Sequence, residues 1–310
     1  MDAPERKDSD FPPEKEALAC LKLIKNETQL MTVTTSGIVT ITNVFNYKII
    51  KLLRIPVQPA KADVSLDGKK IAIVDNRHGR IVIYNLENAD ITQVNIDAHF
   101  NAFQILLTSS QRYVVLLGEW GMLVWDLKRS KTKIHAMLTS FDINHVLTLN
   151  GKDKLITYGD HLFMQWDILT ASHSVIVNTR SKHVKAFCID RQNTILAYAT
   201  KGGNIHVYDM IRRKELRKLS TIYSDINGIS MVSDSRCLLF RCSEALKLWN
   251  LETGECYIIN DDSALISYSF VMDYKLTFLA VVKTRNELLF CYFLHGYDFE
   301  VESKDSEAII

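Results

Sequence analysis

Short apolar segments that end in Asn or Asp recur along the chain at a nearly constant interval. Successive end residues are 42, 41, 41, 42 and 41 apart, and 41 further residues lead to Cys291 inside the apolar segment ELLFCYFL. Each segment is rich in Val, Ile, Leu, Tyr and Phe and is bounded by turn residues, which is typical of a β-strand. The pattern predicts seven repeated units. The six Asx ends are Asn43, Asn85, Asp126, Asp167, Asp209 and Asn250.

Each unit contains room for four strands and none for a long helix. A second apolar run precedes each marked segment, as IAIV follows the polar turn SLDGKK. A further strand precedes that turn, as in VKAFCID (184–190), and another follows the Asx, as in KELRKL (214–219). Four antiparallel strands in 40 to 45 residues are typical of a β-propeller blade. We therefore expect an all-β, seven-bladed β-propeller of four-stranded antiparallel blades.

The repeat register also predicts the boundaries of the domain. A single propeller is expected over residues 17–303, between a charged, flexible N-terminal tail at 1–16 and a short C-terminal tail at 304–310. Its first strand falls at about residues 18–24, and YDFEVES (297–303) is a candidate outer strand of the seventh blade. The alternative is a chain of separate α+β units, because PEKEALACLKL favours a helix, but the repeat register assigns part of that segment to the first strand.

The strand ends resemble those of WD repeats. Trp125-Asp126, Trp166-Asp167 and Trp249-Asn250 share one phase of the repeat, and LETGE (251–255) matches the usual turn of that family. The resemblance implies a propeller but says little about function. The Gly-His dipeptide of the family is nowhere intact, and its hydrogen-bonded tetrad cannot be assembled fully in any blade. Blade stability is therefore expected to depend more on apolar packing than on buried polar networks.

Composition and charge narrow the class of protein. Gly and Pro together make up roughly 5% of the 310 residues, against roughly 12% on average, which excludes collagen-like and Gly/Pro-rich disordered chains. The net charge of +1 gives no overall attraction to nucleic acid or to an anionic membrane. Six cysteines without a C-x-x-C pair, and an N-terminus without an apolar signal, favour reduced thiols and a cytoplasmic location, with a nuclear one as the alternative.

Motifs for chemistry are absent from the sequence. It contains no phosphate-binding glycine loop, no nucleophile elbow and no metal-protease motif, and its nine histidines fall singly. Acidic and basic residues alternate outside one strand, so no basic face for nucleic acid is expected. We predict a protein that is not an enzyme and has no cofactor, metal, nucleic-acid or membrane contact.

The loops between second and third strands are the predicted binding surface. In a propeller they emerge on the same face as the connections between blades, so their side chains converge around one mouth. Trp120 is the only Trp outside the repeat phase, and a loop aromatic near Arg and His is typical of interaction hot spots. Alternatively, Trp120 folds back as a lid over its own blade. The candidate partner-binding residues are Arg77, His78, Trp120, His161, Glu244 and Arg285.

These observations favour a scaffold or adaptor, a monomeric propeller that binds one or more protein partners within a complex. A second hypothesis comes from IRRKELRKL (211–219), in which five of nine residues are basic. These charges could simply protect an exposed outer strand. The segment is also similar in part to the phosphoinositide-binding PROPPIN propellers, in whose F/L-R-R-G motif Arg217 and Lys218 would contact lipid and Leu219 replaces the Gly.

Overall fold

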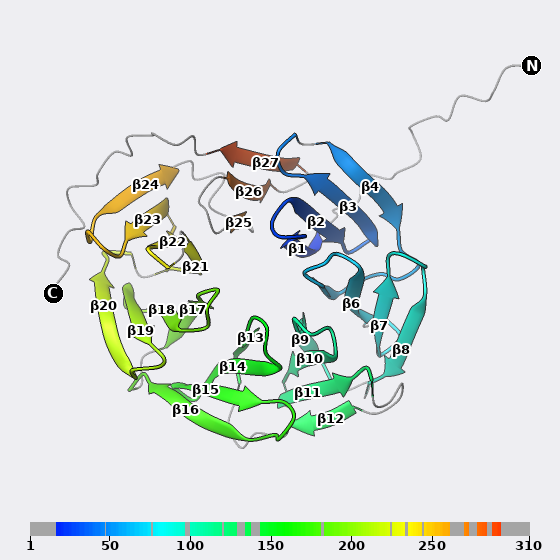
Figure 1. The fold of residues 1–310 in the computed structure, drawn as a ribbon, viewed down its shortest axis with the longest axis horizontal. Helices are drawn as coiled ribbons and strands as arrows, with labels where there is room; N and C mark the ends of the chain where they lie inside the picture. Colours follow the sequence, from blue (N-terminus) through cyan, green and yellow to red (C-terminus); the bar gives the residue numbers. More distant parts are fainter. Residues whose placement is uncertain are drawn as a thin grey trace, which may run out of the picture.

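The chain forms a ring of antiparallel sheets, and in each sheet the first strand lies nearest the centre and the last strand nearest the periphery (Figure 1). The structure is a computed structural model. It describes residues 17–46, 48–75, 77–96, 100–119, 121–128, 134–137, 143–180, 183–223, 225–232, 235–243, 245–260, 270–272, 278–283 and 287–292. In each sheet the strands follow chain order, so a blade is built from consecutive hairpins and runs outward from its first strand.

Six sheets have four strands and are numbered here as blades one to six. Blade one contains β1 (Leu18–Ile24), β2 (Gln29–Thr34), β3 (Ile38–Asn43) and β4 (Ile49–Arg54). Blade two contains β5 (Lys61–Val64), β6 (Lys70–Asp75), β7 (Arg80–Asn85) and β8 (Ile91–Asn95). Blade three contains β9 (Ala102–Leu107), β10 (Tyr113–Gly118), β11 (Gly121–Asp126) and β12 (Ile134–Met137).

Blade four contains β13 (His145–Thr148), β14 (Lys154–Gly159), β15 (Leu162–Asp167) and β16 (His173–Asn178). Blade five contains β17 (Val184–Ile189), β18 (Ile195–Thr200), β19 (Asn204–Asp209) and β20 (Lys214–Ser220). Blade six contains β21 (Gly228–Val232), β22 (Cys237–Arg241), β23 (Leu246–Asn250) and β24 (Cys256–Asn260). A last sheet contains β25 (Phe270–Met272), β26 (Phe278–Lys283) and β27 (Glu287–Tyr292).

The prediction of seven four-stranded blades is wrong, because the described part of the chain has six such blades and a last sheet of three strands. The candidate outer strand at 297–303 lies outside the described residues, as do the expected tails at 1–16 and 304–310. The last unit also differs from the others in sequence. The repeat spacing leads to Cys291 and β27 ends at Tyr292, so neither position carries the Asx residue that ends the third strand of the six complete blades.

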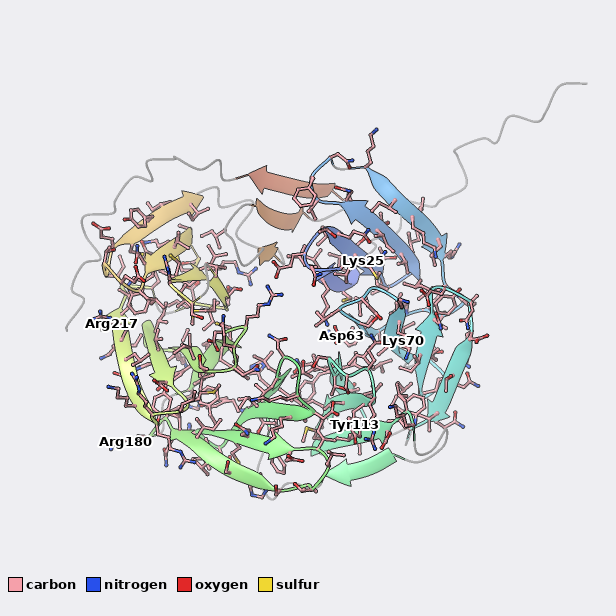
Figure 2. The ribbon with its side chains drawn as sticks, in the orientation of Figure 1. Lys25, Asp63, Lys70, Tyr113, Arg180 and Arg217 are labelled. Atoms are coloured by element: carbon pink, nitrogen blue, oxygen red, sulfur yellow. The ribbon has the colours of Figure 1, made fainter. Side chains whose placement is uncertain are left out.

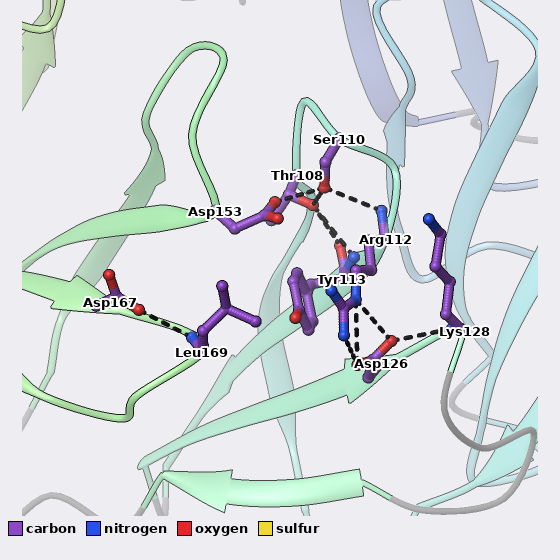
Figure 3. Close-up of polar contacts among 9 residues, drawn as sticks. All are labelled: Thr108, Ser110, Arg112, Tyr113, Asp126, Lys128, Asp153, Asp167 and Leu169. Carbon is purple, nitrogen blue, oxygen red and sulfur yellow. Dashed lines mark hydrogen bonds and ion pairs between the residues drawn. The ribbon is translucent and has the colours of Figure 1, made fainter.

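That Asx residue holds the turn between the third and fourth strands. Oδ1 of Asp167 accepts hydrogen bonds from the backbone N–H groups of Leu169 and Thr170, at 3.0 and 3.2 Å. Oδ1 of Asp126 accepts one from Lys128 at 2.9 Å (Figure 3). Asx side chains favour turns because they bond the backbone two residues on. The Oδ1 atoms of the other four Asx residues accept equivalent bonds from backbone N–H groups of their own turns: Asn43, Asn85, Asp209 and Asn250.

The hydrophobic core lies between blades rather than inside any one of them. In β10, alternate residues pack in opposite directions: Val114 and Leu116 pack against blade two, and Val115 and Leu117 against blade four. Five such clusters join neighbouring blades from one to six among the described residues. A blade therefore has no buried face without its neighbours.

Hydrogen bonds between neighbouring first-to-second-strand turns follow the ring on one face. Gln111 donates to Asp67 Oδ2 at 2.7 Å, which joins blades three and two. Ser110 donates to Asp153 of blade four (Figure 3). Similar bonds connect later blades, from Asn193 to the carbonyl of Asn150 at 2.9 Å and from Ser235 to Asp190 at 3.2 Å.

Two buried tryptophans differ in the hydrogen bonding of their indole N–H groups. Nε1 of Trp166 donates to Thr157 at 2.8 Å. Nε1 of Trp249 is buried and has no hydrogen-bond partner among the described residues. Both indoles pack in clusters between blades. In these blades, apolar contact holds the indole even where its polar atom has no partner.

Gly203 lies in the second-to-third-strand turn of blade five, close to the backbone that follows the fourth strand of that blade. Its φ is +76°, and an added Cβ would lie 2.4 Å from the carbonyl oxygen of Tyr223. Gly151 also has a positive φ, +67°, but an added Cβ there would meet nothing within 4 Å. Gly151→Ala should cost about 1 kcal/mol from backbone strain alone. Gly203→Ala should cost about 1–3 kcal/mol more from the overlap. Chemical denaturation of both variants measures this, and equal losses would contradict the close approach.

Candidate interaction surfaces

In four blades, the turn between the second and third strands lies on the face where the chain passes to the next blade. In four blades, the first residue after the fourth strand donates its N–H to a carbonyl in the second-to-third-strand turn of the same blade. Examples are Thr179 to His161 at 2.8 Å and Thr221 to Gly203 at 3.0 Å. Ile55 to Gly37 and Ile96 to Gly79 are equivalent, at 2.9 and 2.8 Å. We call this side of the ring the loop face.

Arg77 and His78 lie at the tip of the blade-two turn on the loop face. Both are exposed, whereas Asp75 below them is almost fully buried. Oδ2 of Asp75 accepts from Arg80 Nε and lies within hydrogen-bond distance of His78 Nδ1, both at 2.8 Å. Burial raises the pKa of Asp75, but the bonds from Arg80 and His78 outweigh it and hold that pKa below its ordinary value. His78 thus forms part of the turn, while Arg77 projects from it.

His161 lies at the equivalent turn of blade four, next to the connection into blade five. Its ring packs edge-on against that of His183, with centroids 5.2 Å apart. His161 is half-buried, and its Nδ1 is buried without a hydrogen-bond partner among the described residues. The loop face therefore brings together imidazoles from consecutive blades. The structure shows no described contact between this pair and Arg77 or His78.

Three of the predicted partner-binding residues, Trp120, Glu244 and Arg285, lie outside the described residues. Whether Trp120 is a hot spot or a lid over blade three thus stays a prediction. Its neighbour Glu119 accepts a hydrogen bond from Asn101 at 3.1 Å, which ties the second strand of blade three to the residue that precedes its first strand.

The basic outer strand of blade five does not gather its charges into one site. Arg217 is exposed at the periphery (Figure 2), Lys218 is half-buried and Leu219 is fully buried. Arg217 pairs with Val207 and Lys218 with His206, so the two side chains point to opposite faces of the strand. Glu215, whose carboxylate lies within hydrogen-bond distance of His206 Nδ1 at 2.7 Å, adds a negative charge beside them. Arg217 and Lys218 cannot converge on one phosphate in this conformation.

Near the axis, the sequence-based search missed a buried carboxylate that joins three blades. Asp63 of β5, on the inner side of the ring (Figure 2), pairs with Lys22 of β1 at 2.7 Å. Its other oxygen accepts the backbone N–H of Leu107 in β9, also at 2.7 Å. These partners lie 41 and 44 residues away. Only the repeat length, which brings such positions together, could have indicated the pairing.

The described residues offer little for catalysis. They contain no group of three or more His, Cys, Asp or Glu able to hold a metal ion. Burial raises the pKa of the Cys20 and Cys188 thiols to about 12, assisted at Cys20 by the charge of Asp63. Both sulfurs therefore stay protonated near neutral pH.

Among the described residues, no helix has the length and apolar character needed to cross a bilayer.

A second feature missed by sequence reasoning is the outer strand of blade one. Several large apolar side chains of β4 and the preceding turn are exposed there. A signal in the sequence could have indicated it, because no Asp or Glu occurs between residues 28 and 62.

Asp75 provides a pH-dependent test of the blade-two turn. Its pKa is lowered in the folded state, so its contribution to stability is present above the ordinary value of about 4 and is lost as pH falls. Asp75→Asn should lower the free energy of unfolding by about 1–3 kcal/mol at pH 7. The difference from the unchanged protein should shrink between pH 5 and 3, as measured by urea denaturation. Asp160→Asn, in the exposed turn of blade four, is the control. A difference that persists at pH 3 would contradict this account.

Comparison with known proteins supports the fold and gives one distant relative. No family model matches the chain. The probable U3 small nucleolar RNA-associated protein 18 of Schizosaccharomyces pombe is 27% identical over 194 residues, 56% of this chain and 36% of the relative. The chain thus matches about a third of that protein's length.

Two solved structures of Hsv2 from Kluyveromyces lactis superpose with a TM-score of 0.69. One, with a complete loop 6CD, is 12% identical and the other 14%; each covers 86% of this chain and 90% of the Hsv2 chain. At this level of identity the likeness is one of fold alone. Together with the strand ends of the sequence, it confirms that the chain resembles WD-repeat β-propellers.

Proposed function

We propose that this chain is a non-enzymatic platform that binds protein partners on its loop face. The observation that carries the proposal is the backbone bonding of that face, in which the turn carbonyls of four blades accept bonds from the ends of their own outer strands. Turns fixed in this way lose little conformational entropy when a partner binds. Arg77, His78 and His161 are the described residues proposed to contact partners; Trp120, Glu244 and Arg285 complete the set.

The relative suggests the kind of assembly in which this chain binds its partners. By its name it is associated with U3 small nucleolar RNA, and we extend to this chain a place in a ribonucleoprotein assembly, held through protein contacts rather than RNA contacts. The same likeness favours a nuclear over a cytoplasmic location. Affinity purification with and without ribonuclease tests the first point, since the partner list should not change. Fluorescence microscopy of the tagged chain tests the second.

A charge reversal on the loop face tests the proposal directly. Arg77→Glu combined with His161→Ala should remove at least one partner from an affinity purification of the full chain, because Arg77 is exposed and His161 half-exposed on turns that backbone bonds hold in place. The melting temperature should stay within about 2 °C, as for exposed substitutions. Trp120→Ala with Arg285→Glu should act likewise.

Lys152→Glu is the matched control, because Lys152 is exposed in a first-to-second-strand turn. An unchanged partner list in both loop-face variants, or an equal loss in the Lys152 variant, would refute the assignment of this face.

The phosphoinositide alternative stays a prediction. It requires binding to vesicles that contain phosphoinositide, lost at high salt and in Arg217→Ala with Lys218→Ala. The opposite orientation of these two side chains does not favour it.

A further inference from the structure

We propose that the outer edge of blade one binds an extended, acidic and apolar segment of a protein partner by β-strand addition. This inference rests on the proposed function and adds a second surface with a defined partner chemistry. The β4 edge is defined here by the apolar residues Phe45, Ile49, Ile50 and Leu52 and the basic residues Lys48, Lys51 and Arg54.

The apolar side chains of the β4 edge are unusually accessible. Their exposed fractions are 68% for Phe45, 60% for Ile49, 51% for Ile50 and 64% for Leu52. Within the strands alone, β4 exposes three large apolar residues, whereas the other outer strands with described side chains expose one at most: Ile91 in β8, Val175 in β16 and Leu216 in β20. The turns before β16 and β20 each expose one more, Leu169 and Ile211. Contiguous exposed apolar residues are typical of interaction sites.

Strand pairing explains why these side chains are not part of the core. Leu53, opposite Val39, packs into the cluster between blades one and two. Leu52 follows on the other face, opposite Thr40. A bulge leaves Ile50 without a partner on β3, since Ile41 pairs with Lys51 and Thr42 with Ile49. The pairing therefore places Ile49, opposite Thr42, and Leu52, opposite Thr40, on the face of β4 away from Leu53, while Ile50 is the extra residue of the bulge.

The backbone of β4 is also available for pairing. β4 is the end strand of its sheet. The N–H of Ile55 bonds Gly37 on the β3 side at 2.9 Å, so in the alternation of an antiparallel pair Leu53 and Lys51 also face β3. The N–H and C=O groups of Leu52 then point away from the sheet. An edge of this kind accepts an added strand through main-chain hydrogen bonds, with side-chain contacts giving specificity.

The positive charge of the β4 edge indicates the chemistry of its partner. The whole chain is balanced, with 37 basic and 36 acidic residues, yet residues 28–62 contain four basic residues and no acidic one. Lys48, Lys51 and Arg54 are exposed within 7 residues of one another. Because Lys51 Nζ donates to the carbonyl of Leu86 in blade two at 2.8 Å, Lys48 and Arg54 are the cations proposed to meet the partner. An acidic segment would complement them. Nucleic acid fits less well, because phosphates offer nothing to the aliphatic side chains between these cations.

The experiment uses the full chain and a fluorescein-labelled peptide of four Glu-Val repeats, followed by fluorescence anisotropy. We expect saturable binding at 50 mM NaCl that weakens several-fold at 500 mM. A peptide of four Lys-Val repeats should not bind. Ile50→Glu with Leu52→Glu should abolish binding, whereas Ile91→Glu, an exposed apolar residue of the neighbouring outer strand, should leave it unchanged.

Leu52→Pro separates strand addition from simple apolar contact. Proline removes an N–H that does not bond β3, so the blade should keep its melting temperature. The Pro variant should bind the Glu-Val peptide about tenfold more weakly than Leu52→Ala, which corresponds to one lost hydrogen bond. Equal affinities of the Pro and Ala variants would refute added-strand pairing.

Several results would overturn the proposal. These are no binding of the Glu-Val peptide, equal binding of the Lys-Val peptide, or binding that survives Ile50→Glu with Leu52→Glu. Binding of this edge to vesicles of anionic lipid in place of the peptide would assign it to a membrane. A dimer in light scattering that the same double variant dissolves would assign it to a second copy. A negative result with the Glu-Val peptide would contradict the β4 proposal alone, because the loop-face proposal is tested by a different experiment, the partner list of the loop-face variants.

Discussion

The structure depends on one constraint: a blade has two apolar faces and can cover neither by itself. All six residues of β10 are buried, and alternate ones contribute to clusters shared with blades two and four. A sheet of this kind is stable only between two others. Polar groups also bond across the junctions between blades. Asp63 of blade two accepts hydrogen bonds from Lys22 of blade one and from the N–H of Leu107 of blade three.

Burial of both faces leaves few places where function can reside. The strand centres are committed to packing, so the accessible backbone is found at turns and along fourth strands. The loop-face turns are held by bonds such as Thr221 to Gly203, and therefore present side chains in fixed positions. The fourth strands, in contrast, differ from one another in the side chains that they expose. β20 carries Lys214, Glu215 and Arg217 at its surface, whereas β4 exposes Ile49, Ile50 and Leu52.

The sequence predicted most of the fold because its clearest repeat has a local cause. The Asx residues that end the third strands bond the backbone of their own turns, as Asp167 bonds Leu169, so the signal does not depend on distant contacts. The predicted first strand at 18–24 is confirmed as β1. The prediction of seven four-stranded blades was wrong at the last unit, where neither Cys291 nor Tyr292 supplies such an Asx residue. The sequence offers only indirect signals for the pairing of Lys22 with Asp63 and for the exposure of β4, namely the repeat length and the lack of acidic residues at 28–62. Both features depend on which segments become neighbours in the ring.

Charge distribution connects these surfaces. A net charge of +1 suggests a chain without electrostatic preference, but fields between exposed charges decay over about 10 Å at 0.1 M salt, so each surface acts on its own. On β20, Glu215 and its bond to His206 interrupt the positive charge, and charged side chains protect that edge. On β4, cations alternate with aliphatic residues and no acid intervenes. Blade one can therefore select an acidic strand although the whole chain is nearly neutral.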